Sequence, residues 1–247
     1  MHFTGTADQA LSTRVGTVRR EVLRRLRRQA PRVAGLATDS LPDAAVPVRG
    51  LAVYFVDFAS LVVSTRFCYW GQRRMRDDRR APSRSYLKVE EAYAVLGEAP
   101  SRGQRVADLG AAPGGWSYSA AERGAEVIAV DNGPLKGGAL GHPRITHVRA
   151  DAFRFRADRP FDWLFCDLIE SPERVLREIL VRWLEQRLCR AFIVNLKVGK
   201  ADPLRLLREL RSDRSDGLVG LCERLCIRQL YHDRDEITCM GIALSGR

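Results

Sequence analysis

The chain has 247 residues, enough for one α/β domain with an appendage, and its hydrophobic fraction of 45% can fill a core, which excludes wholesale disorder. The formal net charge is +11, so nucleic acid is the first partner to consider, although basic residues also serve solubility. No apolar stretch approaches the roughly 20 residues that span a bilayer, and residues 1–16 lack the apolar run of a signal peptide.

The 6 cysteines form no CxxC pair, and several lie inside apolar runs. Buried free thiols are the ordinary outcome of such a distribution, whereas zinc sites use a different spacing. We therefore expect no metal site. We also expect a cytoplasmic location, because reduced thiols are typical of that compartment.

An arginine-rich segment occupies the start of the chain and extends to about Arg32. Apolar residues recur in it at helical spacing: Val18, Val22, Leu23 and Leu26. This pattern predicts a helix. Its charged face has two open interpretations, a surface that binds RNA phosphates or an ordinary solvated helix face.

Two short apolar strands are predicted next, at 51–56 and 61–67, around an Asp-Phe-Ala-Ser turn. The stretch before them, from residue 33 to 48, contains proline and is predicted to be a loop. Residues 72–80 are polar and charged and are predicted to be a linker. Because two strands alone are only marginally stable, this pair must pack on another element.

From Ala81 onward, predicted strands alternate with predicted helices. The strands are expected at 106–109, 126–130, 145–148, 163–166, 191–196, 224–230 and 237–243. The helices are expected at 114–123, 172–187 and 204–210. This alternation predicts a mostly parallel, doubly wound α/β sheet. The short connection between the last two strands predicts a hairpin, so one terminal strand should be antiparallel.

The strongest local signal is Asp108–Trp116 (DLGAAPGGW), a turn of small residues between a predicted strand and a predicted helix. Small residues let the backbone approach a ligand closely, and a helix N-terminus offers free N–H groups. The spacing is not GxGxxG and no Walker lysine follows, which argues against a dinucleotide and against ATP hydrolysis.

Aspartates mark the ends of the first four strands of this region: Asp108, Asp131, Asp151 and Asp167. Asp131 comes about 20 residues after the turn, where an acid that binds ribose hydroxyls is expected. Because clustered carboxylates repel one another, the set indicates an edge of the sheet that binds a ligand.

These residues resemble the FtsJ-like family of ribose 2′-O-methyltransferases, whose S-adenosylmethionine motif matches DLGAAPGGW. A longer series resembles the RlmM branch, which methylates a cytidine ribose of 23S ribosomal RNA. That series comprises Ala81–Lys88, Glu90–Ala92, Val130–Pro134, Trp163–Asp167, Asn195–Lys197 and Gln229–Glu236. The resemblance extends over about residues 51–243 and is sharpest from Ala81.

The resemblance implies a Rossmann-like class I methyltransferase sheet in residues 81–247, with an antiparallel terminal strand, after a basic appendage in 1–80. It implies S-adenosylmethionine as cofactor and RNA as partner; we expect a monomer. The family's lysine–aspartate–lysine–glutamate tetrad matches Lys88, Asp167, Lys197 and Glu236. The implied cofactor contacts are Ser85, Ala112, Pro113, Gly114, Gly115, Trp116, Asp131, Asp151 and Asp167.

The sequence departs from the RlmM pattern at its N-terminal side. RlmM proteins have a longer N-terminal part that includes a THUMP-type RNA-binding region. We interpret the predicted hairpin at 51–67 as a remnant of that region. The shortening leaves the RNA target open, because the appendage is expected to select the substrate.

The tetrad also makes chemical sense without the family. A ribose hydroxyl is a poor acid, so its attack on a sulfonium methyl requires proton removal. A lysine can accept that proton only if its pKa is lowered, as nearby positive charge does. Lys197 is therefore the predicted general base, with Lys88 and Asp167 as positioning groups and Glu236 as an orienting group.

Other functions remain open at this stage. One is an RNA-binding protein of the same fold that has lost catalysis, which the complete tetrad argues against. Another is a methyltransferase for a small molecule or a protein, which the two lysines and the positive charge argue against. A third is a 2′-O-methyltransferase for another RNA, such as transfer RNA or a cap structure.

Overall fold

The computed structural model describes residues 2–5, 9–36, 48–67, 75–199, 202–212 and 217–244. The chain divides into two compact units, Met1–Gly71 and Gln72–Arg247. Each unit has its own sheet, of three and seven strands respectively. Most of the predicted loop at 33–48, the first part of the predicted linker at 72–80, and Cys68 lie outside the described residues.

The boundary between the units falls after Gly71, whereas the sequence placed it after Arg80. The described part of the predicted linker packs on the second unit. The Tyr118 hydroxyl donates a hydrogen bond of 3.0 Å to the Asp78 carboxylate, and Arg80 pairs with Glu122 at 3.1 Å. These polar contacts fix residues 75–80 at the start of the larger unit.

The smaller unit contains β1 (His2–Gly5), α1 (Gln9–Gln29), α2 (Pro31–Gly35), β2 (Val48–Phe55) and β3 (Leu61–Phe67). Strand β2 pairs antiparallel with β3 and parallel with β1, so the predicted hairpin gains a third strand. Its core consists of Leu11, Val15, Val53 and Phe55. The N-terminal helix is confirmed, but its buried face starts earlier than the predicted stripe, because Val22, Leu23 and Leu26 are only half-buried.

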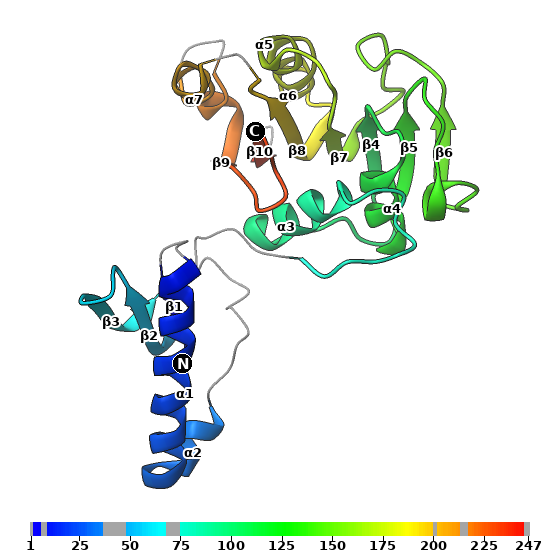
Figure 1. The fold of residues 1–247 in the computed structure, drawn as a ribbon. Coiled ribbons are helices and arrows are strands. Elements are labelled where there is room, and N and C mark those ends of the chain that lie inside the picture. Colours follow the sequence, from blue (N-terminus) through cyan, green and yellow to red (C-terminus); the bar gives the residue numbers. More distant parts are fainter. Residues whose placement is uncertain are drawn as a thin grey trace. The chain divides into compact units, whose positions relative to one another are not determined.

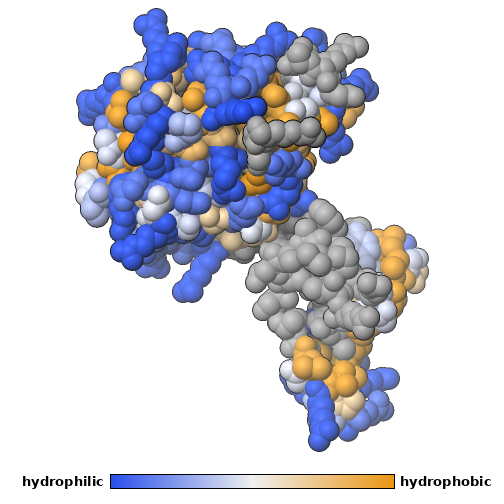
Figure 2. All heavy atoms as spheres, turned by 180° about the vertical axis from the view of Figure 1, so that it is seen from behind, coloured by the Kyte–Doolittle hydropathy of each residue, from blue (hydrophilic) through white to orange (hydrophobic). Residues whose placement is uncertain are grey.

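Hydrophobic side chains remain exposed on the β2–β3 hairpin of the smaller unit, including Phe58, Val62 and Val63. Figure 2 shows hydrophobic residues gathered on this unit, whereas the visible face of the larger unit is mainly hydrophilic. In the described part of the chain, no helix has the length and apolar character needed to cross a membrane.

The larger unit is built on a seven-stranded sheet with the order β6-β5-β4-β7-β8-β10-β9. Its strands are β4 (Arg105–Leu109), β5 (Glu126–Val130), β6 (Ile145–Val148), β7 (Phe161–Cys166), β8 (Cys189–Lys197), β9 (Cys222–Arg228) and β10 (Glu236–Ala243). Strands β4 to β8 are parallel, and β10 pairs antiparallel with both β8 and β9. The predicted fold class and the antiparallel terminal hairpin are confirmed.

Helices cover both faces of this sheet (Figure 1). On one face lie α3 (Tyr86–Leu96) and α4 (Gly115–Glu122); on the other lie α5 (Pro172–Val175), the π-helical turn η2 (Leu176–Val181), α6 (Arg182–Glu185) and α7 (Pro203–Leu210). Short 3₁₀ turns occur at η1 (Gly137–Ala139) and η3 (Val219–Leu221). A hydrophobic core lies on each face of the sheet, the first under α3 and α4 and the second under α5 to α7. Side chains of β7 alternate between them: Trp163 and Phe165 belong to the first core, and Leu164 and Cys166 to the second.

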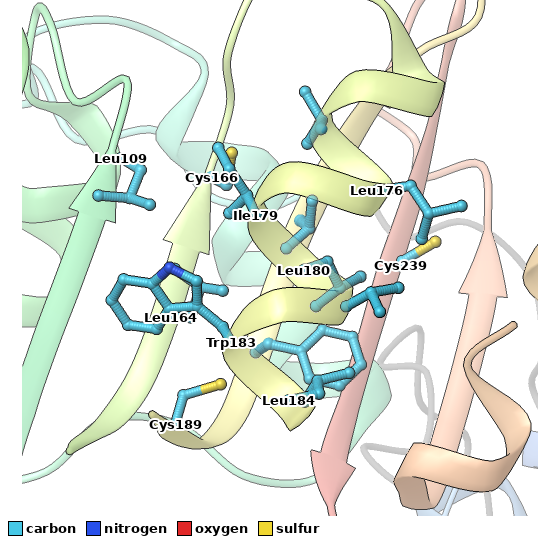
Figure 3. Packing of buried hydrophobic residues seen from close by; sticks show 14 of the residues in the cluster. Leu109, Leu164, Cys166, Leu176, Ile179, Leu180, Trp183, Leu184, Cys189 and Cys239 are labelled. Atoms are coloured by element: carbon cyan, nitrogen blue, oxygen red, sulfur yellow. The ribbon is translucent and has the colours of Figure 1, made fainter. Parts of the chain in front are cut away.

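The second core is packed by the continuous helical segment from α5 to α6. Figure 3 shows Ile179, Leu180 and Trp183 of this segment beside Leu164 and Cys166 of the sheet. All five side chains are at most 1% exposed. This packing holds the central strands rigid, so the side chains at their carboxyl ends have fixed positions.

Helix α3 was not predicted. The sequence analysis assigned no element to Lys88, which lies in the first turn of this helix and is buried. The helix has buried residues on nearly all sides, among them Leu87, Val89 and Glu91, so it lacks the apolar stripe that indicates an amphipathic helix. It also begins without a side-chain cap.

Candidate active site

The glycine turn follows β4 at the carboxyl edge of the sheet and leads into α4. Gly110 and Gly114 have φ angles of 81° and 105°, in the left-handed region that favours glycine. A Cβ at Gly110 would lie 2.6 Å from the Leu168 side chain, and one at Gly114 would lie 2.5 Å from Cβ of Ala139. Both positions therefore require glycine.

Asp131 lies beside this turn, as the sequence predicted for residues after β5. Its two carboxylate oxygens accept hydrogen bonds from the backbone N–H groups of Ala112 (3.0 Å) and Gly133 (2.7 Å). Carboxylate oxygens have further acceptor capacity, so the same group can also accept from ligand hydroxyls. On the other side of the turn, the N–H of Lys136 donates to the Pro113 carbonyl at 2.9 Å.

Ser85 and Trp116 connect the turn to α3. The Trp116 indole N–H donates to the Ser85 carbonyl at 3.0 Å, and its ring packs edge-on against Phe165 in the core. A Cβ at Gly115 would lie 3.0 Å from the Ser85 hydroxyl oxygen. The structure thus brings Ser85 against the glycine turn, while the indole of Trp116 is buried.

Asp151 and Asp108, two more of the predicted aspartates, have hydrogen-bond partners other than the turn backbone that Asp131 contacts. Asp151 is exposed after β6, and its carboxylate accepts from the Phe153 N–H at 2.9 Å and pairs with Arg154, both on its own loop. Asp108 is buried under the turn and accepts a hydrogen bond of 2.6 Å from the Ser117 hydroxyl. Of the four aspartates, Asp108 therefore stabilises the start of α4 from inside the protein.

The predicted tetrad converges at the carboxyl ends of β7 and β8. Lys197 lies between two carboxylates, 2.5 Å from Asp167 Oδ1 and 2.7 Å from Glu236 Oε1. The Lys88 ammonium pairs with Glu236 Oε2 and lies 3.8 Å from Asp167 Oδ2. The four side chains are only 10–22% exposed. Residues far apart in the sequence thus form one closed ion-pair network.

Asn195 completes this network, and the sequence analysis did not assign it a role. Its side-chain N–H group donates to Asp167 at 3.1 Å and to Glu236 at 2.8 Å. Its carbonyl oxygen accepts from the Thr238 hydroxyl at 3.2 Å. Its spacing in the sequence could have indicated this role, because Asn195 and Lys197 lie two residues apart and so share one face of an otherwise apolar strand.

A cavity of about 470 Å³ opens beside the network, which we call the tetrad cavity. It is lined by Arg84, Ser85, Lys88, Tyr231, His232, Asp233, Arg234 and Glu236. Two tetrad side chains and one predicted cofactor contact therefore face the same space. Within the described ranges, no three His, Cys, Asp or Glu side chains gather in a way that could hold a metal ion.

Known proteins share both the motifs and this arrangement of elements. The family model described as FtsJ-like methyltransferase matches residues 81–221. The chain belongs to the FtsJ-like methyltransferase family. Membership implies a methyl donor, and the matched residues include the glycine turn, Lys88, Asp167 and Lys197.

Relatives of this FtsJ-like chain carry the name ribosomal RNA large subunit methyltransferase M. The protein from Laribacter hongkongensis is 41% identical over 206 residues, which cover 76% of this chain and 57% of that protein. The protein from Halorhodospira halophila is 43% identical and covers 72% of this chain and 52% of its own length. The chain thus spans little more than half the length of these relatives.

A solved structure of a hemolysin-named protein from Lactococcus lactis shares the fold. It superposes with a TM-score of 0.51 at 15% sequence identity and covers 67% of this chain and 89% of its own. At that identity the likeness shows the architecture alone.

The electrostatics of the FtsJ-like tetrad differ from the expectation. Burial, the largest single influence, favours the neutral amine of Lys197, but Asp167 and Glu236 together outweigh it and raise its pKa above the ordinary value. Burial also disfavours the charged form of Glu236, yet hydrogen bonds from Lys197, Lys88 and Asn195 lower the pKa of this carboxyl to about 2. The sequence argument required a lowered pKa for Lys197, and that expectation is wrong for this structure because the carboxylates lie in contact with the ammonium.

Proposed function

We propose that this chain transfers a methyl group from S-adenosylmethionine to a ribose 2′-hydroxyl of RNA, with a cytidine of 23S ribosomal RNA as the target. The convergence of Lys88, Asp167, Lys197 and Glu236 beside the glycine turn is the observation that carries this proposal. Family membership and the names of the relatives support the reaction class and the RNA.

The cofactor contacts remain those proposed from the sequence, namely Ser85, Ala112, Pro113, Gly114, Gly115, Trp116, Asp131, Asp151 and Asp167. The chain's own geometry fits such a ligand at the turn. Gly114 is buried and packs against Ala139, whereas Ala112 and Pro113 of the turn remain partly exposed, and α4 begins directly after the turn. Asp131 lies against the same backbone and offers acceptors for ribose hydroxyls.

When bound, the cofactor supplies a methyl group on a positively charged sulfur. Lys197 accepts the proton of the ribose hydroxyl as the oxygen attacks the methyl carbon, and it can do so only as a neutral amine. The ammonium of Lys88 shares the Glu236 carboxylate with Lys197 in the same network. Asp167 and Glu236, which are themselves held by Asn195, fix the direction of the Lys197 amine. In-line transfer needs such alignment.

Methyl transfer can be tested directly on the full chain. Purified protein is mixed with S-adenosylmethionine labelled in its methyl group and an unmodified 23S ribosomal RNA transcript, and the labelled nucleoside is identified. We expect label on the 2′-oxygen of a cytidine. Binding of the transcript without transfer would indicate a catalytically inactive RNA-binding protein, and preferential labelling of transfer RNA would replace the proposed target.

We also propose that the protein is a cytoplasmic monomer whose smaller unit is a remnant of a THUMP-type region. Reduced cysteines agree with that compartment, and the five cysteines in the described ranges form no disulfide. Light scattering during gel filtration tests the monomer, since a second copy would double the 27.8 kDa mass.

A further inference from the structure

Tyr231 is an exposed aromatic residue in the wall of the tetrad cavity. It retains 47% of its surface exposure, whereas most of the large side chains of this unit are buried. Its ring meets the His232 ring edge-on, with 4.9 Å between the centroids and an angle of 74°. An aromatic face that is open to solvent is the group on which unpaired nucleobases stack.

The backbone that carries this ring is fixed at both ends. The N–H of Tyr231 donates to the carboxylate of Glu91 at 2.7 Å, and Glu91 is fully buried in α3. The N–H of Leu230 donates to Asp233 at 2.8 Å, and the N–H of Asp233 donates back to the Leu230 carbonyl at 3.1 Å. A stacking surface held in this way loses little conformational freedom when a ligand binds.

The charges around the ring favour a polyanion. Arg84 and Arg234 line the same cavity. Arg84 pairs with Asp77 through one nitrogen, and in the described part of the chain the Arg234 guanidinium forms no ion pair. The acidic members of the wall have partners of their own, because Glu236 is held by both tetrad lysines and Asp233 accepts from the Leu230 N–H and the Thr238 hydroxyl.

We propose that Tyr231 stacks on an unpaired nucleobase of the RNA substrate, while Arg84 and Arg234 contact the adjoining phosphates. The proposal rests on the proposed function, since it specifies how RNA is held at that site. Lys88 and Glu236 line the same cavity, so a nucleotide stacked there lies next to the reacting groups. The substrate is a single-stranded or extruded nucleotide, because neighbouring bases cover both faces of a base within a helix.

The test compares Tyr231→Ala and Tyr231→Phe with Val219→Ala. Val219 is also 47% exposed but lies in η3, outside the cavity lining. Binding of the 23S transcript is measured by filter retention, and methyl transfer is measured over a range of RNA concentrations. We expect Tyr231→Ala to weaken RNA binding and raise the KM for RNA by roughly 10-fold, as loss of one stacked base implies. The kcat and the cofactor affinity should stay near the wild-type values.

The phenylalanine variant should behave like the wild type, because it keeps the ring, and so should Val219→Ala. Wild-type RNA binding by Tyr231→Ala would overturn the inference, as would an equal loss in Tyr231→Phe or Val219→Ala. Filter binding does not depend on turnover, so it separates the two proposals. A wild-type protein that transfers no methyl contradicts the proposed function, whereas active protein that binds RNA equally well without the ring contradicts only the role of Tyr231.

Discussion

Lys197 and Glu236 are direct partners across the antiparallel pair of β8 and β10, and their side chains meet at 2.7 Å. The register of the two strands therefore brings these side chains together. A shift of one residue would move the side chains of the shifted strand to the other face of the sheet. Lys88 comes from α3 and Asp167 follows β7, so four elements, three neighbouring strands and one helix, hold the network at one edge.

Replacement of Lys197 tests its role as base. Lys197→Ala should lower methyl transfer by at least about 100-fold, the usual contribution of general-base catalysis. Lys197→Arg is the more specific test of the base role. Arginine keeps the positive charge between Asp167 and Glu236 but does not become neutral in a protein. Both variants should be nearly inactive while cofactor binding, measured by calorimetry, stays intact. Appreciable turnover in the arginine variant would rule out the base assignment.

Glu236→Gln should shift the pH dependence of the reaction. The Glu236 carboxylate helps to raise the pKa of Lys197, so its removal lowers that pKa. If the neutral amine is the active form, the rate rises with pH up to the pKa of Lys197, and the rising limb should move to lower pH in the variant. Glu209→Gln, which changes an ion pair with Arg205 on α7, is the control. An unmoved limb in Glu236→Gln would contradict the coupling.

The succession of strands and helices along the larger unit could be predicted because it depends on local patterns, whereas the tetrad was implied by the resemblance to the FtsJ-like family. Apolar runs between turn residues marked the strands of the larger unit, and the short connection before Glu236 indicated the terminal hairpin. The side chains that follow parallel strands meet at one edge by topology alone, which brought Asp131 and Asp167 to the same edge.

Other features depend on tertiary contacts that leave little trace in the sequence. Helix α3 is buried on nearly all sides, so its residues show no helical stripe. The role of Asn195 depends on register, which places Thr238 opposite it. The raised pKa of Lys197 depends on which charges lie nearest, and a list of tetrad members does not give those distances.

Asp131→Asn should weaken cofactor binding. The carboxylate accepts from two backbone N–H groups of the turn region, those of Ala112 and Gly133, and an amide offers only one acceptor oxygen. We expect roughly 10-fold lower affinity for S-adenosylmethionine, in line with the loss of a hydrogen bond to a charged group. Asp158→Asn, at an exposed ion pair with Arg105, is the matched control. Equal affinities in the two variants would exclude Asp131 from the cofactor site.

Asp108→Asn should remove a pH dependence of stability. Burial, together with the Asp167 and Asp131 charges, raises the pKa of Asp108 from 3.8 to about 7. Because the folded state holds the proton more tightly than the unfolded state, this group favours folding below about pH 4, and its contribution is lost as the pH rises through about 7. The difference amounts to roughly 4 kcal/mol at about 1.4 kcal/mol per pKa unit.

Thermal unfolding followed between pH 4 and 8 checks this expectation. The free energy of unfolding of the wild type should fall relative to that of Asp108→Asn across the window, and the difference should level off above pH 7. Ser117, whose hydroxyl donates to Asp108, can donate to the asparagine oxygen as well. Parallel curves for the two proteins would mean that Asp108 does not titrate in this range.

Substitutions on the arginine-rich face of α1 can distinguish a surface that binds RNA phosphates from an ordinary solvated helix face. Arg24 and Arg25 both pair with Glu21, whereas Arg27 and Arg28 are exposed at the end of the helix. If Arg27 and Arg28 each contact a phosphate, the double alanine variant should bind the 23S transcript more weakly. The slope of log affinity against log salt concentration should then fall in magnitude by roughly 0.7 to 0.9 per lost contact.

The matched control for that experiment is Arg174→Ala, since Arg174 lies in the larger unit and already pairs with Glu170 and Glu178. Its slope should stay at the wild-type value. A changed affinity with an unchanged slope would indicate that Arg27 and Arg28 act through the fold of the smaller unit, because only released counterions alter the slope. Unchanged affinity and slope in the double variant would show that α1 presents an ordinary solvated face, and phosphate binding would then have to come from the larger unit.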